Sequence, residues 1–393
     1  MTAVAEFKNT LGRIHVENLG IYVHVPFCRV RCRFCAFYME MSRDDRIQTF
    51  LEGLDHELCL YARDVGLRTI PVHTIYFGGG TPTTLTSQQL IRMLNAIRHW
   101  FAVEDDAEVS IEVHPGTVTP ESLATLRQAG FTRLSVGGQS FDQDELRGLG
   151  GRAFGGGVRQ AISWARSAGF TNISLDLLYG FPGQSIESWQ RTLEEALAVS
   201  PTHLSCYAYT LEEGSPFYRE VMRGKGSEPD QEFQVVLEER AVERLTAAGF
   251  ERYEISNYCR PGYECRHNMR YWQVQAYLGL GPSAQSCLGH ARFGNVANLE
   301  WYADSLKKGT LPLDEMSCLS HDQVDCERVI WGLRMLSGVS VRLNSMENHQ
   351  GRALLQMIHQ LKNEGLLQVD GQERVKLTDL GIRYADTVAV ALL

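Results

Sequence analysis

A local pattern of helix, Ala-Gly-Phe turn and apolar strand recurs three times in this chain and limits the folds open to it. The repeats are TLRQAGFTRLSVGG, WARSAGFTNISLDLLYG and RLTAAGFERYEIS, with turn glycines at Gly130, Gly169 and Gly249. Glycine suits the left-handed position just past a helix end, where a side chain would be strained, and the phenylalanine can fold back onto the last helical turn. Helices that alternate with strands in this way predict parallel strands joined by helical crossovers.

Four other short apolar runs extend this series of strands: GIYVHVPF, HTIYFGGG, EVSIEVHPG and THLSCYAYT. Amphipathic helices are expected between them, over residues 44–63 and from residue 87, where Ser87 would be the N-cap. About six β/α units favour a partial or complete barrel over an open sheet. The predicted fold class is therefore α/β, a partial (β/α)6 TIM-like barrel whose functional loops follow the C-terminal ends of the strands.

The C-terminal part of the chain follows a different pattern. A helix is expected over residues 354–363, then a hairpin, LLQV-DG-QERVKL, and a helix capped by Thr378 or Asp379. This order is winged-helix-like and predicts a small α+β domain. Residues 351–393 contain five Lys/Arg and five Asp/Glu, so their charge favours a lid or interaction module over nucleic-acid binding. The expected division is an N-terminal extension (1–19), a core barrel (20–245), a barrel extension (246–313) and a C-terminal domain (314–393).

The composition of the chain limits the binding partners and the cellular compartment that we expect for it. The 393 residues include 38 Lys+Arg and 47 Asp+Glu, and the formal net charge of −9 argues against nucleic acid or an anionic membrane as the main partner. No stretch approaches the roughly 20 apolar residues of a membrane span, and the N-terminus lacks a signal-peptide pattern, so a cytoplasmic protein is expected. Seven of the ten cysteines are scattered, as expected for buried small apolar residues in a reducing compartment.

The other three cysteines, Cys28, Cys32 and Cys35, form a C-x3-C-x2-C pattern on the loop after the first predicted strand. Thiolates bind zinc and iron–sulfur clusters. A structural zinc site would need a fourth Cys or His at similar spacing, whereas three ligands on one tight loop suit a [4Fe-4S] cubane with one open iron. Three arginines on the same loop would offset the negative charge of the thiolates: Arg29, Arg31 and Arg33. The pattern favours a cluster over zinc or three buried structural cysteines.

This cysteine motif resembles that of the radical S-adenosylmethionine (SAM) superfamily. Further segments are similar to the oxygen-independent coproporphyrinogen III oxidase family: YVHVPFC, GGGTPT, LSVGGQSFD, NISLDLLYGFPGQS, HLSCYAYTLEEGSPF, YEISNYCRPGYECRHNMRYW and YLGLGPSAQS. The oxidase branch has another Cys at the position of Phe37; Phe37 and the HNxxYW element, His267 to Trp272, resemble the HemW-type heme chaperone branch. The resemblance implies a [4Fe-4S] cluster on the three cysteines, with SAM bound to the open iron, where an electron from the cluster cleaves it.

The resemblance also implies roles for individual residues. The residues expected to contact the SAM on the cluster are Tyr22, Gly79 and Glu112. Those that match the second SAM site of the oxidase are Phe34, Gly80, Thr81, Gln139 and Asp176. From residue types alone, Tyr22 and Phe34 are equally compatible with barrel packing, and Asp176 with capping the loop after its strand.

The HNxxYW segment is the expected heme site. A lone histidine is more often a hydrogen-bonded structural residue than a ligand, but the resemblance favours His267 as a ligand of heme iron, with Cys265 as the rival. The same segment offers arginines for the propionates and aromatic rings for the porphyrin plane: Arg266, Arg270, Tyr271 and Trp272.

Two functions follow from the resemblance. The first is a heme chaperone that binds the cluster, SAM and heme and transfers heme to an acceptor protein, with a flavodoxin or ferredoxin as an expected reductant. The second is a radical SAM enzyme that acts on a porphyrinogen, or a divergent methylase or cyclase. The chain also departs from its relatives: Gly151 replaces an arginine that contacts the second SAM in the oxidase, and SAQS at 283–286 replaces GAHS.

Overall fold

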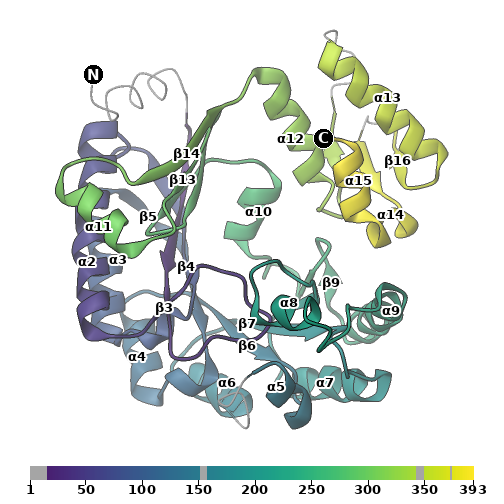
Figure 1. Cartoon of the computed structure of the whole chain (residues 1–393), viewed down its shortest axis with the longest axis horizontal. Coiled ribbons are helices and arrows are strands. Elements are labelled where there is room, and N and C mark those ends of the chain that lie inside the picture. The colour runs from purple at the N-terminus through teal and green to yellow at the C-terminus, as the bar shows by residue number, and fades with distance from the viewer. Residues whose placement is uncertain (1–15, 151–156, 342–348, 372–373) are drawn as a thin grey trace.

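The computed structural model describes residues 16–150, 157–341, 349–371 and 374–393, and its centre is a layer of parallel strands with helices on the outside (Figure 1). The parallel strands are hydrogen-bonded in chain order: β1 (Leu19–Val25), β4 (Pro71–Gly79), β5 (Ala102–Val113), β6 (Arg133–Gln139), β7 (Asn172–Tyr179) and β8 (His203–Ala208). Their crossover helices are α2 (Asp44–Cys59), α3 (Ser87–Trp100), α4 (Pro120–Gln128), α5 (Gln143–Gly148), α6 (Gly157–Ser167), α7 (Ile186–Ala198) and α9 (Gln231–Ala247). The predicted α/β fold with a partial (β/α)6 barrel is confirmed.

The Ala-Gly-Phe turns end their helices as expected. Gly130, Gly169 and Gly249 have φ of 98°, 91° and 82°. After α6, the Gly169 N–H donates to the Arg166 carbonyl (2.9 Å) and the Phe170 N–H to that of Ala165 (3.0 Å). This pair of bonds is a Schellman motif, which satisfies carbonyls that the helix end would otherwise leave without partners.

Two helix boundaries differ from the expectation. The helix over 44–63 is α-helical to Cys59 and continues as a π-helical segment, Leu60–Val65. The N-cap of α3 is Thr86, not Ser87, because the Thr86 side chain accepts the Gln89 N–H while the Gln89 side chain accepts the Thr86 N–H. This reciprocal pair is a capping box, which needs the hydroxyl three residues before the glutamine.

The strand residues alternate between an apolar outer face and a polar inner face. In β1, the residues packed under the helices are fully buried: Leu19, Ile21, Val23 and Val25. On the inner face of β5, by contrast, lie Glu108, Ser110 and Glu112. The hydrophobic core therefore lies between strands and helices, and the barrel interior is lined by polar groups suited to a polar ligand.

The sheet continues beyond the parallel strands at both edges. Beside β1 lie β11 (Tyr277–Leu280), β12 (Gln285–Leu288), β13 (Ala291–Asn295) and β14 (Leu313–Cys318); beside β8 lie β10 (Asn257–Cys259) and β9 (Glu251–Arg252). Among the described residues β14 and β9 are the two ends of this order, so the barrel is partial. The buried Glu57 of α2 holds the β11 side in place, since it accepts the Gly281 N–H (2.8 Å), the Asn295 amide (2.6 Å) and the Tyr302 hydroxyl (2.7 Å).

Shorter elements complete the barrel region. Strands β2 (Phe27–Cys28) and β3 (Glu40–Met41) pair beside the cysteine loop, α8 (Pro216–Val221) follows β8, and α10 (Arg266–Trp272) and α11 (Leu299–Lys307) belong to the β9–β14 region. No helix within the described ranges is long and apolar enough to span a membrane.

The C-terminal elements have a small core of their own. They are α12 (His321–Gly332), β15 (Val339–Ser340), α13 (His349–Asn363), β16 (Leu367–Val369), β17 (Arg374–Leu377), α14 (Asp379–Arg383) and α15 (Ala385–Ala391). The predicted helix, hairpin and helix are present, and Thr378 is the N-cap of α14. Because β14 pairs with β13 in the main sheet, we propose that this unit begins after Cys318 rather than at residue 314.

We predict that Gly169→Ala lowers the free energy of unfolding by about 1–2 kcal/mol, because alanine at a left-handed φ is strained. Open space surrounds this position, so the backbone conformation alone is tested. Gly148→Ala in α5 is the matched control, since it also has open space and its φ is not positive. Urea unfolding of the three proteins checks this, and equal stability of both variants would contradict it.

Candidate functional site

The cysteine loop leaves β1 and is pinned by the glycine turn after β4. The Gly80 N–H donates to the Val25 carbonyl (2.9 Å) and the Thr81 N–H to the Phe27 carbonyl (2.8 Å). A Cβ atom on Gly80 would lie 2.8 Å from the Phe27 carbonyl oxygen, so only glycine lets the two backbones approach this closely. The Thr81 hydroxyl lies 3.6 Å from the Cys28 Sγ. The GGGT turn therefore sets the position of the first cysteine.

The chemistry of the three thiols fits a cationic iron–sulfur cluster. Burial, followed by the charges of Cys35 and Cys28, raises the pKa of Cys32 to about 12. Burial also raises the pKa of Cys28 and of Cys35, and Glu112 adds to both shifts. Thiols in such a place become thiolates when a metal centre supplies positive charge. The [4Fe-4S] cluster would be held by these three residues.

The arrangement of side chains does not suit a single metal ion. Across the described part of the chain, no three His, Cys, Asp or Glu side chains form a group that could hold one ion. A cubane makes no such demand, because each of its thiolate ligands binds a different iron atom. The three cysteines therefore need to share a loop rather than converge on one point.

Only part of the expected arginine charge reaches the thiols. Arg31 lowers the pKa of Cys35. Arg33 instead pairs with Glu220 of α8, donates to the Gly148 carbonyl (2.5 Å) and lies over the Phe217 ring, 4.7 Å from its centroid. The expectation that Arg33 offsets the thiolate charge is therefore wrong, because this side chain ties the loop to α8.

Glu112, at the end of β5, lies inside the barrel beside the cysteine loop. Its Oε1 accepts the Tyr76 hydroxyl (3.2 Å) and would lie 2.9 Å from a Cβ on Gly78. Burial and the neighbouring charge of Asp176 raise the pKa of Glu112 to about 7, while hydrogen bonds from Tyr76 and the Gly79 N–H oppose the shift. The charge of Glu112 also contributes to the raised pKa of Tyr22, after burial. This carboxylate is the natural counter-ion for a cationic ligand.

Asp176, in the middle of β7, does not cap a loop. Its carboxylate accepts the hydroxyls of Ser135 (2.9 Å), Ser174 (3.1 Å) and Ser205 (2.8 Å), from three neighbouring strands. The interpretation of Asp176 as a loop cap is therefore wrong, because the side chain points into the barrel. Gln139 ends β6 at a bulge, with φ of 59°, a strained conformation for a residue with a side chain.

The other predicted site residues divide into two groups. Gly80 and Thr81 contact the cysteine loop directly, and Gly79 donates its N–H to Glu112. The charge of Glu112 acts on Tyr22, Cys28 and Cys35. Phe34 instead packs against a satellite apolar cluster made by Leu149, Leu178, Phe181, Tyr209 and Phe217. Gly151 lies outside the described residues.

His267 is fully buried and both of its ring nitrogens have partners. Nδ1 lies 2.8 Å from the Thr74 hydroxyl and Nε2 lies 2.9 Å from the Tyr271 hydroxyl. Cys265 is also fully buried, at the N-cap of α10. Neither ring nitrogen faces a ligand in this conformation, so His267 as a heme ligand stays a prediction.

The neighbours of His267 in α10 have structural contacts. Arg270 donates to the Asn18 side chain (2.7 Å) and to the Ala276 carbonyl (2.8 Å), which joins α10 to the start of β1. Trp272 stacks on Trp331 of α12 at 6.1 Å, and the Arg334 guanidinium lies 4.4 Å from the Trp272 centroid. Arg270 and Trp272 are therefore engaged with protein groups.

Tyr76, whose hydroxyl donates to Glu112, was not among the predicted site residues. Its position in the sequence could have indicated this role, because it lies two residues before Gly78 in an alternating strand and so shares the inward face with the glycine turn. A tyrosine in an aromatic strand is easily assigned to the core, and only the pairing of β4 with β5 brings it to Glu112.

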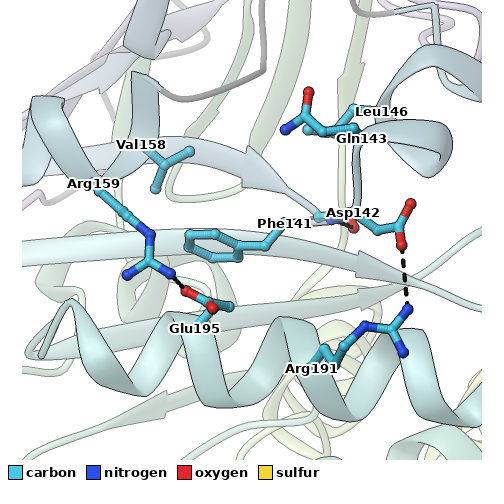
Figure 2. Close-up of a pocket in the computed structure, with 9 residues that line it drawn as sticks. Phe141, Asp142, Gln143, Leu146, Val158, Arg159, Arg191 and Glu195 are labelled. Atoms are coloured by element: carbon cyan, nitrogen blue, oxygen red, sulfur yellow. Dashed lines mark hydrogen bonds and ion pairs between the residues drawn. The ribbon is translucent and has the colours of Figure 1, made fainter.

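A cavity lies on the outer side of the barrel, between the start of α5 and helices α6 and α7 (Figure 2). Arg159 pairs with Glu195, and Arg191 lies 3.3 Å from Asp142. None of the predicted cofactor residues lines it, so it is separate from the cysteine-loop site.

We predict a pH-dependent stability difference between the cluster-free wild type and Glu112→Gln. Glu112 has a pKa of about 7 in the folded state and about 4.5 in the unfolded state, so the folded state holds the proton more tightly. The contribution of Glu112 to the free energy of unfolding therefore falls as pH rises from 4.5 to 7. From pH 5 to pH 8 the wild type should lose about 2 kcal/mol relative to the variant, allowing for partial solvent screening.

Urea unfolding at several pH values checks this difference. Glu57, whose pKa burial also raises to about 7, is present in both proteins and cancels. Parallel pH profiles for the two proteins would contradict the raised pKa of Glu112.

Comparison with known proteins agrees with this geometry. Residues 22–196 match the family model described as the radical SAM superfamily. The chain is 38% identical over 384 residues to the heme chaperone HemW of Mycobacterium tuberculosis, covering 96% of this chain and 95% of the relative. It is 31% identical to HemW of Bacillus subtilis, covering 95% and 98%. The coproporphyrinogen III oxidase (HemN) of Escherichia coli, a radical SAM enzyme, superposes with a TM-score of 0.84 at 26% identity, covering 99% and 93%. The chain therefore belongs to the HemW family of the radical SAM superfamily.

Proposed function

We propose that this protein is a heme chaperone that holds a [4Fe-4S] cluster on Cys28, Cys32 and Cys35, binds SAM beside it and passes heme to an acceptor protein. The observation that carries the proposal is the juxtaposition of three half-buried thiols with Glu112, whose charge acts on Cys28 and Cys35 from the polar barrel interior. The names of the HemW relatives support heme as the cargo. A flavodoxin or ferredoxin as electron donor in the cytoplasm belongs to the same proposal.

The protein's own residues would bind and orient SAM. The cluster supplies an open iron and an electron when it is bound. With a pKa of about 7, Glu112 is about half protonated at neutral pH, and a cationic ligand would favour its ionised form. The Gly78–Gly80 turn leaves room for a ligand to approach the backbone, and Tyr22 and Tyr76 border it. Asp176, with its three serines, remains a candidate contact for a second SAM, together with Phe34, Gly80, Thr81 and Gln139.

Heme would bind on the outer surface of the cysteine loop. Val30 and Phe37 are 53% and 68% exposed there, beside the exposed Arg29 and Arg31. An apolar plane next to cations matches a porphyrin with two propionates, and it needs no rearrangement of buried α10. We therefore propose this loop surface for heme docking, with His267 as the rival site from sequence.

A heme titration of cluster-reconstituted protein tests this function. The wild type should bind about one heme per chain, and Phe37→Ser and Arg31→Glu should each weaken binding about tenfold through lost apolar contact or charge. Trp301→Ser is the matched control, since Trp301 is 60% exposed and belongs to α11. His267→Gln should bind heme like the wild type.

Each contrary result has a defined meaning. Absence of heme binding by the wild type would overturn the chaperone proposal. Loss of binding in His267→Gln with normal binding in Phe37→Ser would overturn the loop-surface site and support the histidine as ligand.

A radical SAM enzyme acting on a porphyrinogen is the second candidate, favoured by the polar barrel interior and the likeness to the E. coli oxidase. Under anaerobic reduction, such an enzyme yields 5′-deoxyadenosine in proportion to added substrate. We expect only slow, substrate-independent cleavage here, and substrate-dependent product would overturn this expectation.

A further inference from the structure

We infer that His267 is a positioning residue for Glu112, acting through the ring of Tyr76. The inference deepens the proposed function and rests on it, because it assumes that SAM contacts Glu112. It assigns to the histidine of the HNxxYW element a task at the SAM site.

Tyr76 is the link between the two residues. Its hydroxyl donates to Glu112 Oε1 at 3.2 Å, and its ring stacks on the imidazole of His267 with centroids 5.3 Å apart and planes at 28°. Tyr22 is the third ring of this group, and its centroid lies 6.2 Å from that of Tyr76 and 6.4 Å from that of His267. The hydroxyl that orients the carboxylate therefore belongs to a ring that packs against both an imidazole and a second phenol, which also contact each other.

The imidazole has a partner at both ring nitrogens, and the backbone of His267 has a third contact. Thr74 bonds Nδ1, Tyr271 bonds Nε2, and the backbone N–H of His267 donates to Glu108 at 3.2 Å. Glu108 also accepts the Arg266 N–H (3.2 Å), so one buried carboxylate accepts two backbone N–H groups from the first turn of α10. A side chain fixed in this way transmits position to the ring stacked on it.

The electrostatics agree with a positioning role. Burial, followed by Arg270 and Arg133, lowers the pKa of His267 to about 3, so the ring is neutral at physiological pH. A neutral imidazole packs against Tyr76 without competing with a cationic ligand for the Glu112 carboxylate. The hydroxyl of Tyr76 favours the ionised form of Glu112, which is the form that attracts a cation.

SAM binding to the reconstituted protein tests the inference. The dissociation constant for SAM is measured by calorimetry, and the change in the electron paramagnetic resonance signal of the reduced cluster on adding SAM is recorded. Tyr76→Phe and His267→Gln should each weaken SAM binding about tenfold and reduce the spectral change, with iron content unchanged. The double variant should be no weaker than either single variant, because both changes act on one carboxylate.

Matched variants separate positioning from general stability. Tyr302→Phe removes a buried tyrosine hydroxyl from a buried carboxylate, Glu57, away from the site, and should bind SAM like the wild type. Thr74→Ser keeps the hydroxyl that faces Nδ1 and should also bind normally. If His267→Gln fails to fold, Tyr271→Phe, which leaves the imidazole in place without its Nε2 partner, should weaken binding about threefold.

Three results would overturn the inference: wild-type SAM affinity in His267→Gln, additive losses in the double variant, or an equal loss in Tyr302→Phe. Failure of the wild type itself to bind SAM is distinguishable from these, because it would remove the proposed function and the inference together.

Discussion

The structure depends on the two-residue alternation of its parallel strands. Odd positions of β1 are apolar and lie under the helices, while the inward positions of the neighbouring strands are hydroxyls, carboxylates and phenols. Buried polar groups are costly unless they have partners. Here the partners are one another: Asp176 has three serines, and Glu112 has Tyr76. The polar interior is therefore an organised network, stable because the hydrophobic core lies in another layer.

The cysteine loop uses this layer as its foundation. Gly80 has no side chain, so the β4 turn can press against the backbone of Pro26 and Phe27, where a Cβ would lie within 2.9 Å of either. The close approach brings Thr81 to Cys28, and the charge of Glu112 acts on the thiols of Cys28 and Cys35. Backbone contacts to the glycine turn, together with the Arg33 side chain on α8, therefore hold the cysteine loop on the barrel.

Local signals in the sequence predicted local structure well. The Ala-Gly-Phe turns, the six parallel strands and the Asp370-Gly371 hairpin are present. The strand expected after Gly249 is only the two-residue β9, which pairs antiparallel with β10 at the end of the sheet. The details of the site depend on residues that meet only in the fold. Arg33 reaches Glu220, 187 positions away, and His267 reaches Thr74, 193 positions away. Residue type alone could not identify a partner so far away in the sequence. The resemblance predicted that His267 is a heme ligand, whereas in the fold it is buried and hydrogen-bonded through both ring nitrogens.

The short helix α10 carries His267 on the barrel side and ends at Trp272, which stacks on Trp331 under the guanidinium of Arg334. An indole stacked on another indole has emission and near-ultraviolet dichroism that change with small displacements. The chain thus contains an intrinsic optical reporter, five residues along α10 from the imidazole that packs on Tyr76. Any movement of α10 relative to the C-terminal unit can be followed in the unmodified protein, with no attached label.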